Sequence, residues 1–552
     1  MLRITELKLP LDHSEAALPA AILTRLSIKA EELTGFTVFR RGYDSRKKAD
    51  IQLVYTLDVE LPTALEAALL KRFRKDVHIG PTPDTSYKYV AATRSFAANT
   101  PRPVVIGFGP CGILAALILA QMGLRPIILE RGKVVRERTK DTWGFWRKRE
   151  LNTESNVQFG EGGAGTFSDG KLWTQVKDPK HYGRKVLEEF VKAGAPEEIL
   201  YVSKPHIGTF RLVKMVEHIR ATIESLGGEF RFQHRVVDLV LETNNDAGGE
   251  GARQKRIRGV VLDNGKTLAA DQVILAIGHS ARDTFKMLHE RGVYIEPKPF
   301  SIGFRIEHPQ GLIDRARFGP NAGNAILGAA DYKLVHHASN GRSVYSFCMC
   351  PGGTVVAATS EEGRVVTNGM SQYSRNERNA NAGIVVGIEP ADFPADMQNP
   401  LGGIDFQRHW ERRAYELGGG NYNAPGQLVG DFVAGRASTA LGSVEPSFKP
   451  GVKLTDLATA LPDYAVVAMR EALPAFDKTI PGFFMADAVL TAVETRTSSP
   501  IRIKRRDDDL QSLNVAGLYP AGEGAGYAGG IMSAGIDGIR VAEAVARAML
   551  TH

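Results

Sequence analysis

The hydrophobic pattern changes character about one hundred residues into the chain. Before that point, alternating runs of the half-buried strand type mix with apolar residues at helical spacing. These runs predict strand, helix, strand, strand and helix over residues 3–9, 15–26, 36–41, 50–61 and 62–74. Small and polar residues with two prolines follow over residues 92–103, which is typical of a linker. We therefore expect a small N-terminal α/β domain over residues 1–98.

Beyond the linker the pattern becomes strand, glycine turn, helix and strand. An apolar run at residues 103–106, typical of a buried parallel strand, leads into G-x-G-x-x-G and then an apolar helix. The first glycine allows a tight turn, the second lets a diphosphate approach the backbone, and the third lets helix and strand pack closely. Free N–H groups at the helix start favour a phosphate. The candidate contacts here are Gly107, Gly109, Pro110, Cys111 and Gly112.

The next predicted strand, residues 125–129, ends in Glu130 and Arg131. An acidic residue about twenty positions beyond the glycine turn can accept hydrogen bonds from ribose hydroxyls. Glutamate at this place disfavours a 2′-phosphate, so NADP is not expected. Because strand, helix and acidic residue agree, we interpret the turn as a dinucleotide site rather than a plain structural turn.

Three later glycine-rich segments favour FAD over NAD. In residues 161–172, small residues would let a loop lie against a flat ring or a phosphate, and the strand at 272–277 ends in a glycine. Residues 517–538 predict a strand, a glycine turn and a helix opened by two glycines. The candidate contacts are Gly162, Gly163, Ala164, Gly165, Thr166, Ala276, Gly278, Gly522, Glu523, Gly529, Gly530 and Ile531.

Four phrases carry a family resemblance: NVQFGEGGAGTFSDGKL, KPFSIGFRIEHPQ, ETRTSSPIRI and PAGEGAGYAGGIMSAGIDG. With them nearly the whole chain resembles a bacterial group of FAD-dependent dehydrogenases in the two-dinucleotide-binding flavoprotein superfamily. The resemblance implies non-covalent FAD, with Glu523 near the ribityl chain or diphosphate, where relatives usually carry aspartate. It also implies that the helix start at residues 529–531 faces the flavin ring and stabilises charge on it.

The expected fold class is α/β: an interrupted Rossmann-type FAD-binding domain, an inserted mixed α+β substrate domain and the small N-terminal domain. The FAD-binding parts are predicted at residues 99–290 and 471–552, and the insertion, rich in short strands and loops, at 291–470. Residues 244–251 predict a flexible glycine-rich loop between two strands, and residues 376–381 a solvated asparagine-rich turn.

Candidates for chemistry lie in or near the insertion. Arg305, His308, His336, His337 and Arg496 could serve an oxidoreductase, since arginine can clamp a substrate carboxylate and histidine can donate a proton beside hydride transfer. Ion-paired arginines and surface histidines are common, so a structural role is the alternative for each. Arg496 is the preferred pocket residue because it belongs to a family phrase, and His336 and His337 are the candidate proton donors.

Cys348 and Cys350, which would share one face of a strand, allow three interpretations. They could be a redox pair that exchanges electrons with the flavin. They could bind zinc together with His336 and His337, although the spacing matches no familiar pattern. We prefer the third interpretation, two small buried residues, and predict no metal site.

Charge and cysteine content indicate the compartment and the kind of partner. The formal net charge of +7 is mild for 552 residues, and three cysteines cannot build a disulfide framework. The chain starts without an apolar signal-peptide segment and has no apolar run long enough to span a bilayer. We therefore expect a cytoplasmic protein whose partner is a small-molecule substrate rather than a membrane or a nucleic acid.

The expected activity is that of an FAD-dependent oxidoreductase transferring hydride between flavin N5 and a small organic substrate. No second intact glycine turn marks a separate nicotinamide domain, so NADH or NADPH could act only as a transient co-substrate. Two alternatives stay open. One is an RNA-associated flavoprotein that uses the basic run RRGYDSRKK at residues 40–48, and the other is a non-catalytic flavin-binding scaffold.

Overall fold

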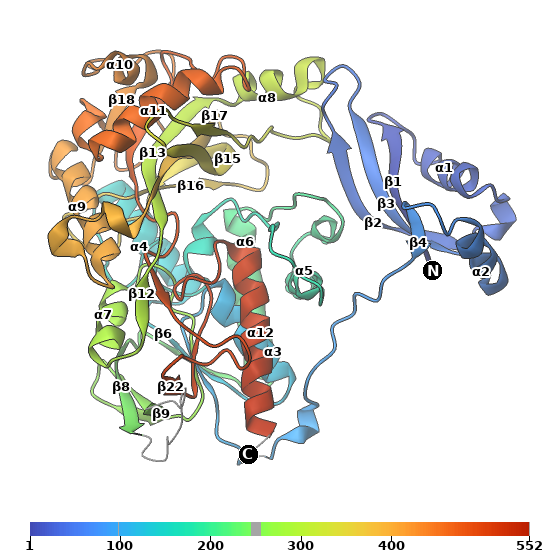
Figure 1. Ribbon diagram of the computed structural model, residues 1–552, viewed down its shortest axis with the longest axis horizontal. Helices are drawn as coiled ribbons and strands as arrows, with labels where there is room; N and C mark the ends of the chain where they lie inside the picture. Colours follow the sequence, from blue (N-terminus) through green and yellow to red (C-terminus); the bar gives the residue numbers. More distant parts are fainter. Residues whose placement is uncertain (98, 244–254, 551–552) are drawn as a thin grey trace.

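The computed structural model describes residues 1–97, 99–243 and 255–550. Four sheets and a two-stranded ribbon make up its β structure. Figure 1 shows the N-terminal sheet set apart from a larger body in which the other sheets are stacked. The expected mixed α/β class is confirmed. Among the helices of these described residues, none has both the length and the apolar character needed to cross a membrane.

The N-terminal unit is a four-stranded antiparallel sheet with two helices packed on one face (Figure 1). Its sheet order, β2-β3-β1-β4, is that of a ferredoxin-like split βαβ motif. Alternate residues of the central strand are buried against the helices, as the sequence pattern predicts. Its elements are β1 (Leu2–Pro10), α1 (Ala17–Leu26), β2 (Gly35–Asp44), β3 (Gln52–Glu60), α2 (Thr63–Arg72) and β4 (Ile79–Pro81).

A five-stranded parallel sheet of order β23-β11-β5-β6-β7 forms the centre of the body. Its edge strand β23 comes from the C-terminal part of the chain and pairs in parallel with β11, so both ends of the body contribute to one sheet. The strands are β5 (Val104–Ile106), β6 (Ile127–Glu130), β7 (Glu229–Phe232), β11 (Val273–Leu275) and β23 (Leu518–Pro520).

The two faces of this sheet pack against different layers. Val105 and Ile128 lie in the core shared with four helices, while Val104 and Ile127 lie in the core on the opposite side. This division follows the two-residue period of a strand. The four helices are α3 (Pro110–Gln121), α5 (Tyr182–Lys192), α6 (Thr209–Ser225) and α12 (Ile531–Leu550).

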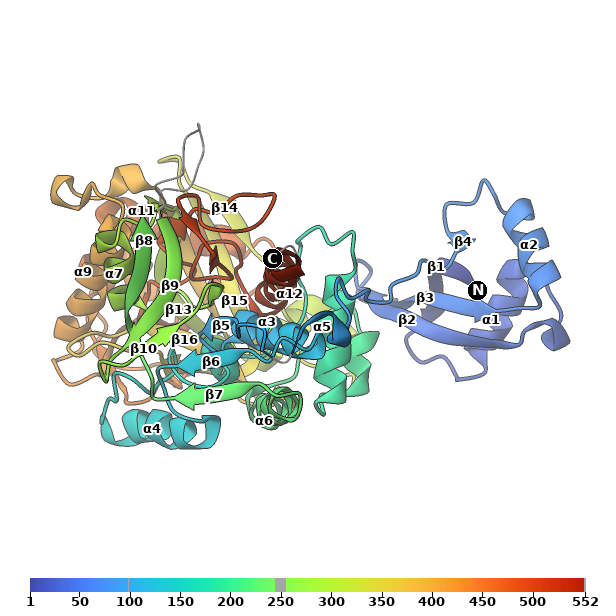
Figure 2. The same ribbon diagram turned by 90° about the horizontal axis from the view of Figure 1, so that it is seen from below.

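The opposite side is covered by a second small sheet and a helix. The loop predicted over residues 244–251 lies outside the described residues. The elements of this layer are β8 (Val236–Thr243), β9 (Lys255–Leu262), β10 (Thr267–Ala269), β22 (Val515–Ala516) and α7 (Arg282–Glu290). Helix α4 (Val135–Lys148) lies beside α6 at the edge of the body (Figure 2).

The region after residue 299 folds around an eight-stranded mixed sheet, order β14-β15-β17-β13-β20-β18-β19 with β16 beside β15. Its strands are β13 (Phe300–Pro309), β14 (Val335–His337), β15 (Ser343–Ala357), β16 (Thr367–Ser371), β17 (Asn379–Ile388), β18 (Ala424–Leu428), β19 (Val452–Leu454) and β20 (Val489–Glu494). Its helices are α8 (Gln310–Phe318), α9 (Gly402–Leu417), α10 (Val429–Ala434) and α11 (Asp463–Phe476). The ribbon of β12 (Ile295–Pro297) and β21 (Ile501–Ile503) connects this region to the parallel sheet.

Two predictions for this region hold only in part. Short strands occur at β14, β16, β18 and β19, but β15 has 15 residues and β13 and β17 have 10 each. Nearly every residue of β13 and β17 is buried, so their sequences lack the alternation that marks a half-buried strand. The asparagine-rich turn is also wrong at its end, since Asn379 and Asn381 are buried in β17.

The N-terminal unit touches the body through the hairpin of β2 and β3, whereas the rest of the unit projects away (Figure 2). The Arg41 backbone N–H donates to the Tyr201 carbonyl at 2.6 Å, and the Ser203 N–H donates to the Arg41 carbonyl at 2.9 Å. Beyond them, Asn321 Nδ2 donates to the Lys48 carbonyl at 2.7 Å. The basic run considered for RNA docking therefore lies on the hairpin that contacts the body.

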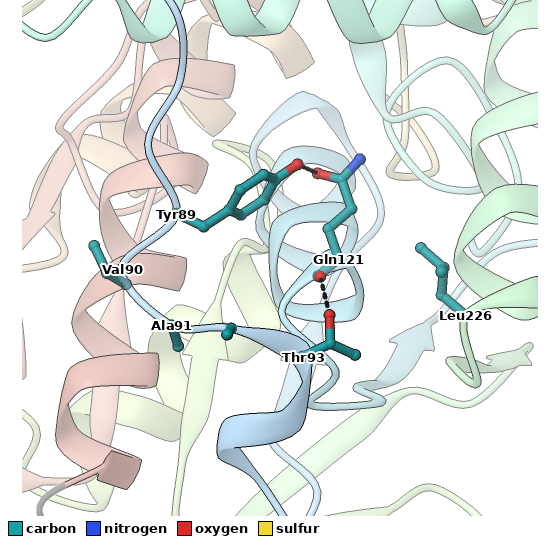
Figure 3. A pocket seen from close by; sticks show the side chains of 7 residues that line it. Tyr89, Val90, Ala91, Thr93, Gln121 and Leu226 are labelled. Atoms are coloured by element: carbon teal, nitrogen blue, oxygen red, sulfur yellow. Dashed lines mark hydrogen bonds between the residues drawn. The ribbon is translucent and has the colours of Figure 1, made fainter.

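The linker returns from the N-terminal unit along the helical face of the body. Tyr87 donates a hydrogen bond to Glu543 of α12 at 3.0 Å. Figure 3 shows the next step, where the Tyr89 hydroxyl donates to Gln121 Oε1 at 2.8 Å and Thr93 Oγ1 donates to the Gln121 carbonyl at 3.4 Å. These residues border an open hollow of about 550 Å³ that Leu226 closes on the far side.

Candidate functional site

A cavity of about 800 Å³ lies between the parallel sheet and the eight-stranded sheet. Its volume is in the range of small-molecule and cofactor sites, about 300–1,000 Å³. The carboxyl ends of β5, β6, β11 and β23 open onto it, as do the N-terminal ends of α3 and α12. Its opposite wall comes from β15, β16 and β20. Ligands of parallel α/β sheets bind at this edge of the sheet.

The glycines of the first turn have separate structural reasons. A Cβ atom at Gly107, whose φ is +93°, would lie 2.4 Å from the Ala276 carbonyl oxygen. A Cβ at Gly112 would lie 2.0 Å from the Gly107 carbonyl oxygen, so this glycine permits close packing of helix on strand. A Cβ at Gly109 would meet nothing closer than Gly163 Cα at 3.5 Å. Gly109 lines the cavity, and no atom of the described residues would clash with a Cβ atom at this position.

The start of α12 forms a second open edge of the cavity. Gly529 and Gly530 are exposed, and a Cβ at either would meet no atom within 4 Å. The loop at Gly163 closes against the first turn, because a Cβ there would lie 2.7 Å from Gly109 Cα. Backbone therefore borders the cavity on several sides, as a site for a diphosphate and a flat ring requires.

Glu130 is buried, and its carboxylate accepts hydrogen bonds from three backbone N–H groups. Oε2 accepts from the Phe108 N–H at 3.0 Å, while Oε1 accepts from the N–H groups of Gly132 at 2.9 Å and Gly160 at 3.0 Å. The carboxylate thereby fixes the first turn and the loop beside it. Oε2 still has a lone pair for a ribose hydroxyl, because an ionised carboxylate oxygen can accept two hydrogen bonds.

Arg131 lines the cavity but is engaged by acidic partners. Its Nε donates to Glu154 at 2.9 Å and its Nη1 donates to Asp283 at 2.8 Å. Both carboxylates keep the guanidinium charged, although burial opposes them. The side chain thus ties β6 to the start of α7 at the adenosine side predicted for the cavity.

Most of the predicted cofactor contacts meet at this cavity. Those that line it are Gly107, Gly109, Pro110, Cys111, Glu130, Arg131, Gly163, Ala164, Gly165, Ala276, Gly278, Glu523, Gly529, Gly530 and Ile531. Those placed behind the wall are Gly112, Gly162, Thr166 and Gly522. The Gly162 N–H donates to the Phe108 carbonyl at 2.8 Å and the Gly522 N–H donates to Asp537 at 2.8 Å, so these two support the wall.

Glu523 is half-buried in the cavity wall. Burial raises its pKa to about 7, and the nearby ammonium group of Lys298 opposes the rise. A carboxyl group with this pKa exchanges its proton near neutral pH. The cavity therefore contains one acid that can hold either a charge or a proton under ordinary conditions.

Arg496 reaches the cavity, but protein groups already occupy its donors. Nε and Nη2 each donate to Glu411 at 3.0 Å, and Nη1 donates to Ser280 at 3.1 Å and Ser360 at 2.7 Å. Glu411 also accepts from Arg282 of α7 at 2.7 Å. Burial would raise the Glu411 pKa, but the two guanidinium groups hold it well below its usual range. Binding a substrate carboxylate would require Arg496 to exchange one of these partners.

The structure does not bring the candidate histidines to the described cavity wall. On the edge strand β14, His336 Nε2 lies 2.9 Å from Glu471, and His337 Nδ1 lies 2.9 Å from Ser343 Oγ. His308 is buried against the Phe483 carbonyl at 2.7 Å, and burial lowers its pKa to about 4. Arg305 is buried in an ion pair with Glu494. No group of three or more potential metal ligands occurs among the described residues, so the zinc interpretation has no ligand cluster.

Among the residues of the cavity wall that the sequence patterns did not single out are Lys171, His279 and Tyr345, whose side chains can carry chemistry. Burial, together with Arg496 and Arg282, lowers the pKa of His279 to about 3, so its ring is neutral. Lys171 belongs to the glycine-rich segment at residues 161–172, and His279 follows Gly278 directly. Proximity in sequence to a predicted contact is the signal that could have identified these two.

Sequence comparisons relate the chain to known proteins. A family model described as the C-terminal domain of an FAD-dependent protein matches residues 299–497, and a model for a domain of unknown function matches residues 1–60. A protein of Clostridium beijerinckii described as uncharacterized is 46% identical over 547 residues, which cover 98% of each chain.

Solved flavoproteins are similar at a lower level. A flavocytochrome c3 fumarate reductase in an open conformation is 12% identical over 86% of this chain and 83% of that one, with a TM-score of 0.33. The FAD complex of CtdE is 12% identical over 80% of this chain and 84% of that one, with a TM-score of 0.31. Likenesses of this size carry no inference about substrate or reaction.

Proposed function

The chain belongs to a family of FAD-dependent proteins, and from this premise we propose that it is an oxidoreductase with an interrupted Rossmann-type FAD domain. The observation that carries the proposal is the meeting of two helix starts, α3 and α12, at one cavity beside a buried acidic strand end. These features come from opposite ends of the body, and each matches a different part of FAD.

The residues present fit non-covalent FAD. Gly109 and the start of α3 would hold the diphosphate, since the N–H groups of a helix start favour phosphate. The absence of a side chain at Gly109 leaves space in the cavity for the diphosphate to approach the backbone. Glu130 would accept from the ribose. Gly529, Gly530 and Ile531 would face the flavin ring, and the positive end of α12 would favour negative charge on it.

FAD would supply the hydride acceptor or donor when bound. The chain's own residues would exclude water and position a small organic substrate against the ring. The wall formed by Tyr345, Phe347 and Met349 of β15 faces the glycine edges across the cavity and is the proposed substrate side. Lys171 and Asn368 add polar groups there.

Cofactor release from the purified protein tests the first part of the proposal. We expect about one FAD per chain after denaturation. An anaerobic titration of the native protein with NADH and then NADPH tests the second part. Bleaching of the flavin band would identify a nicotinamide as a transient co-substrate, whereas a yellow protein that stays unbleached requires another donor. A protein that binds no FAD when it is purified or reconstituted would contradict the proposal.

A further inference from the structure

Cys348 lies in the cavity wall, and Cys350 is buried two residues further along the same strand. Cys348 is half-buried and lines the cavity, whereas Cys350 directly behind it has no exposed surface. Sγ of Cys350 lies 3.4 Å from the carbonyl oxygen of Cys348, so the inner thiol is directed back toward its neighbour. The pair therefore has one cysteine in the cavity wall and one that is fully buried.

The backbone at the pair is not a regular strand. Cys348 has a φ of +45°, and the register of β15 against β17 shifts on both sides of Cys350. An extended strand would separate the two Cα atoms by about 6.6 Å, near the upper end of the range for disulfides. The left-handed conformation of Cys348 and the shifted register interrupt the regular strand at the pair. Residues held in such a conformation cluster at functional sites.

Two cations adjoin the thiols. The Lys171 ammonium donates to the Met349 carbonyl, between the two cysteines, and Arg305 Nη1 donates to the Cys348 carbonyl at 2.8 Å. The Cys350 side chain lowers the pKa of Cys348, and the charges of Lys171 and Arg305 add to this while burial opposes it. The Cys348 side chain and burial raise the pKa of Cys350. One sulfur is thus favoured as thiolate and the other as thiol, the division that thiol–disulfide chemistry uses.

Among the predicted cofactor contacts, Glu523 is close enough to Cys348 for the charge of this cysteine to raise its pKa. Both residues line the same cavity from opposite walls. We propose that Cys348 and Cys350 form a redox-active dithiol that exchanges two electrons with FAD in this cavity, an inference that rests on the proposed function.

In the oxidising direction the Cys350 S–H bond breaks and one S–S bond forms between the Cys348 thiolate and Cys350 Sγ. The two electrons and the Cys350 proton would pass to oxidised FAD, which gives its two-electron reduced anion with no proton left over. The reverse direction reduces the disulfide at the expense of reduced FAD, so flavin and sulfur together store twice the electrons of flavin alone.

The test is an anaerobic dithionite titration of the FAD-containing protein after full oxidation in air, paired with a thiol count. Wild type should take up about two dithionite equivalents per FAD, because disulfide and flavin are each two-electron couples. Alkylation in denaturant followed by intact mass should find one free thiol in the oxidised protein and all three after reduction. Cys348→Ser and Cys350→Ser should each take up about one equivalent.

Three free thiols in the air-oxidised, FAD-containing wild type, with about one dithionite equivalent per FAD, would overturn the inference. If a serine variant loses its flavin, the thiol count on the wild-type protein still shows whether the disulfide forms. Absence of FAD from the wild-type protein is a different result. It would overturn the proposed function, and this inference with it.

Discussion

Single residues of the site divide into those that shape the wall and those that leave room for a ligand. The first turn shows the division best, because its glycines are surrounded differently. Gly107 and Gly112 are fixed by backbone atoms within 2.4 Å of where a Cβ would stand, whereas Gly109 has no such neighbour. The fold therefore requires two of these glycines, whereas the third is required only by the proposed ligand.

Gly109→Val should abolish FAD binding while leaving the fold intact, because its side chain would fill the place of the diphosphate. We expect FAD content to fall by at least about tenfold, equivalent to a loss of about 1.4 kcal/mol or more in binding. The measurements are the flavin-to-protein ratio and the melting temperature of the FAD-free protein. Gly112→Ala is the matched contrast and should lower both. A yellow Gly109→Val protein would remove this turn from the site.

Glu523 should make the FAD-free protein less stable as pH rises. Its pKa is raised from 4.5 to about 7, so between these values the folded protein holds a proton that the unfolded chain has released. The free energy of unfolding therefore falls with rising pH across this window. Glu523→Gln should raise the melting temperature by a few degrees at pH 8 and by less at pH 5.

Glu290→Gln, at an exposed position of α7, is the control for the pH experiment. It should change the melting temperature by a similar small amount at both pH values. A Glu523→Gln variant with the same offset at pH 5 and pH 8 would show that this carboxyl does not titrate in that range.

The sequence identifies residues whose role is local and misses roles that depend on distant partners. The glycines and Glu130 are recognisable because strand, turn and helix are adjacent in the chain. The partners of Arg496 are not, since Glu411 and Ser280 lie 85 and 216 positions away. An arginine in a family phrase therefore suggested a substrate contact, where the structure has an internal network.

At the scale of helices and strands, buried charge joins elements that the sequence keeps apart. Arg282 begins α7, Glu411 lies on α9, and Arg496 follows β20. All three side chains are buried. Their hydrogen bonds hold the loop at Ser280 against the eight-stranded sheet, and this loop is part of the cavity wall.

Glu411→Ala should destabilise the protein strongly, because it leaves two buried guanidinium groups without their shared carboxylate. Removing one partner of a buried ion pair costs about 3–5 kcal/mol. Asp405→Ala, at a position of the same helix that is 52% exposed, should stay within about 0.5 kcal/mol. Urea unfolding of the two variants measures the difference, and equal stabilities would contradict the structural role of the network.

The elements that the sequence predicts well are those with one buried face. The strands and helices of the N-terminal unit alternate as expected and lie within a few residues of their predicted bounds. The strands β13 and β17 are buried on both faces, so their patterns are nearly uniform. Their pairing depends on neighbours far along the chain, which periodicity does not encode.

For the whole molecule, the N-terminal unit and the cavity are separate. The cavity wall contains described residues from Ile106 onward and none from the N-terminal sheet. Hairpin β2–β3 nevertheless touches both the segment at Tyr201 and the end of α8, where Tyr43 packs edge-on against Phe318. The unit thus bridges two parts of the body without reaching the site.

A chain that starts at Pro83 should keep its FAD, since it retains every described residue of the cavity wall and the linker tyrosines. We expect the flavin-to-protein ratio of the full-length protein, purified in parallel. Loss of flavin with an unchanged melting temperature of the body would mean that the N-terminal unit contributes to cofactor binding.

The linker lowers the affinity that the hairpin contact needs in order to keep the N-terminal unit docked. Since residues 82–103 join the unit to the body covalently, docking is an intramolecular event at an effective concentration on the order of millimolar. A contact that would leave two separate polypeptides dissociated at micromolar concentration can then keep the unit docked most of the time. A weaker hairpin contact is therefore enough to dock the unit than two separate polypeptides would need.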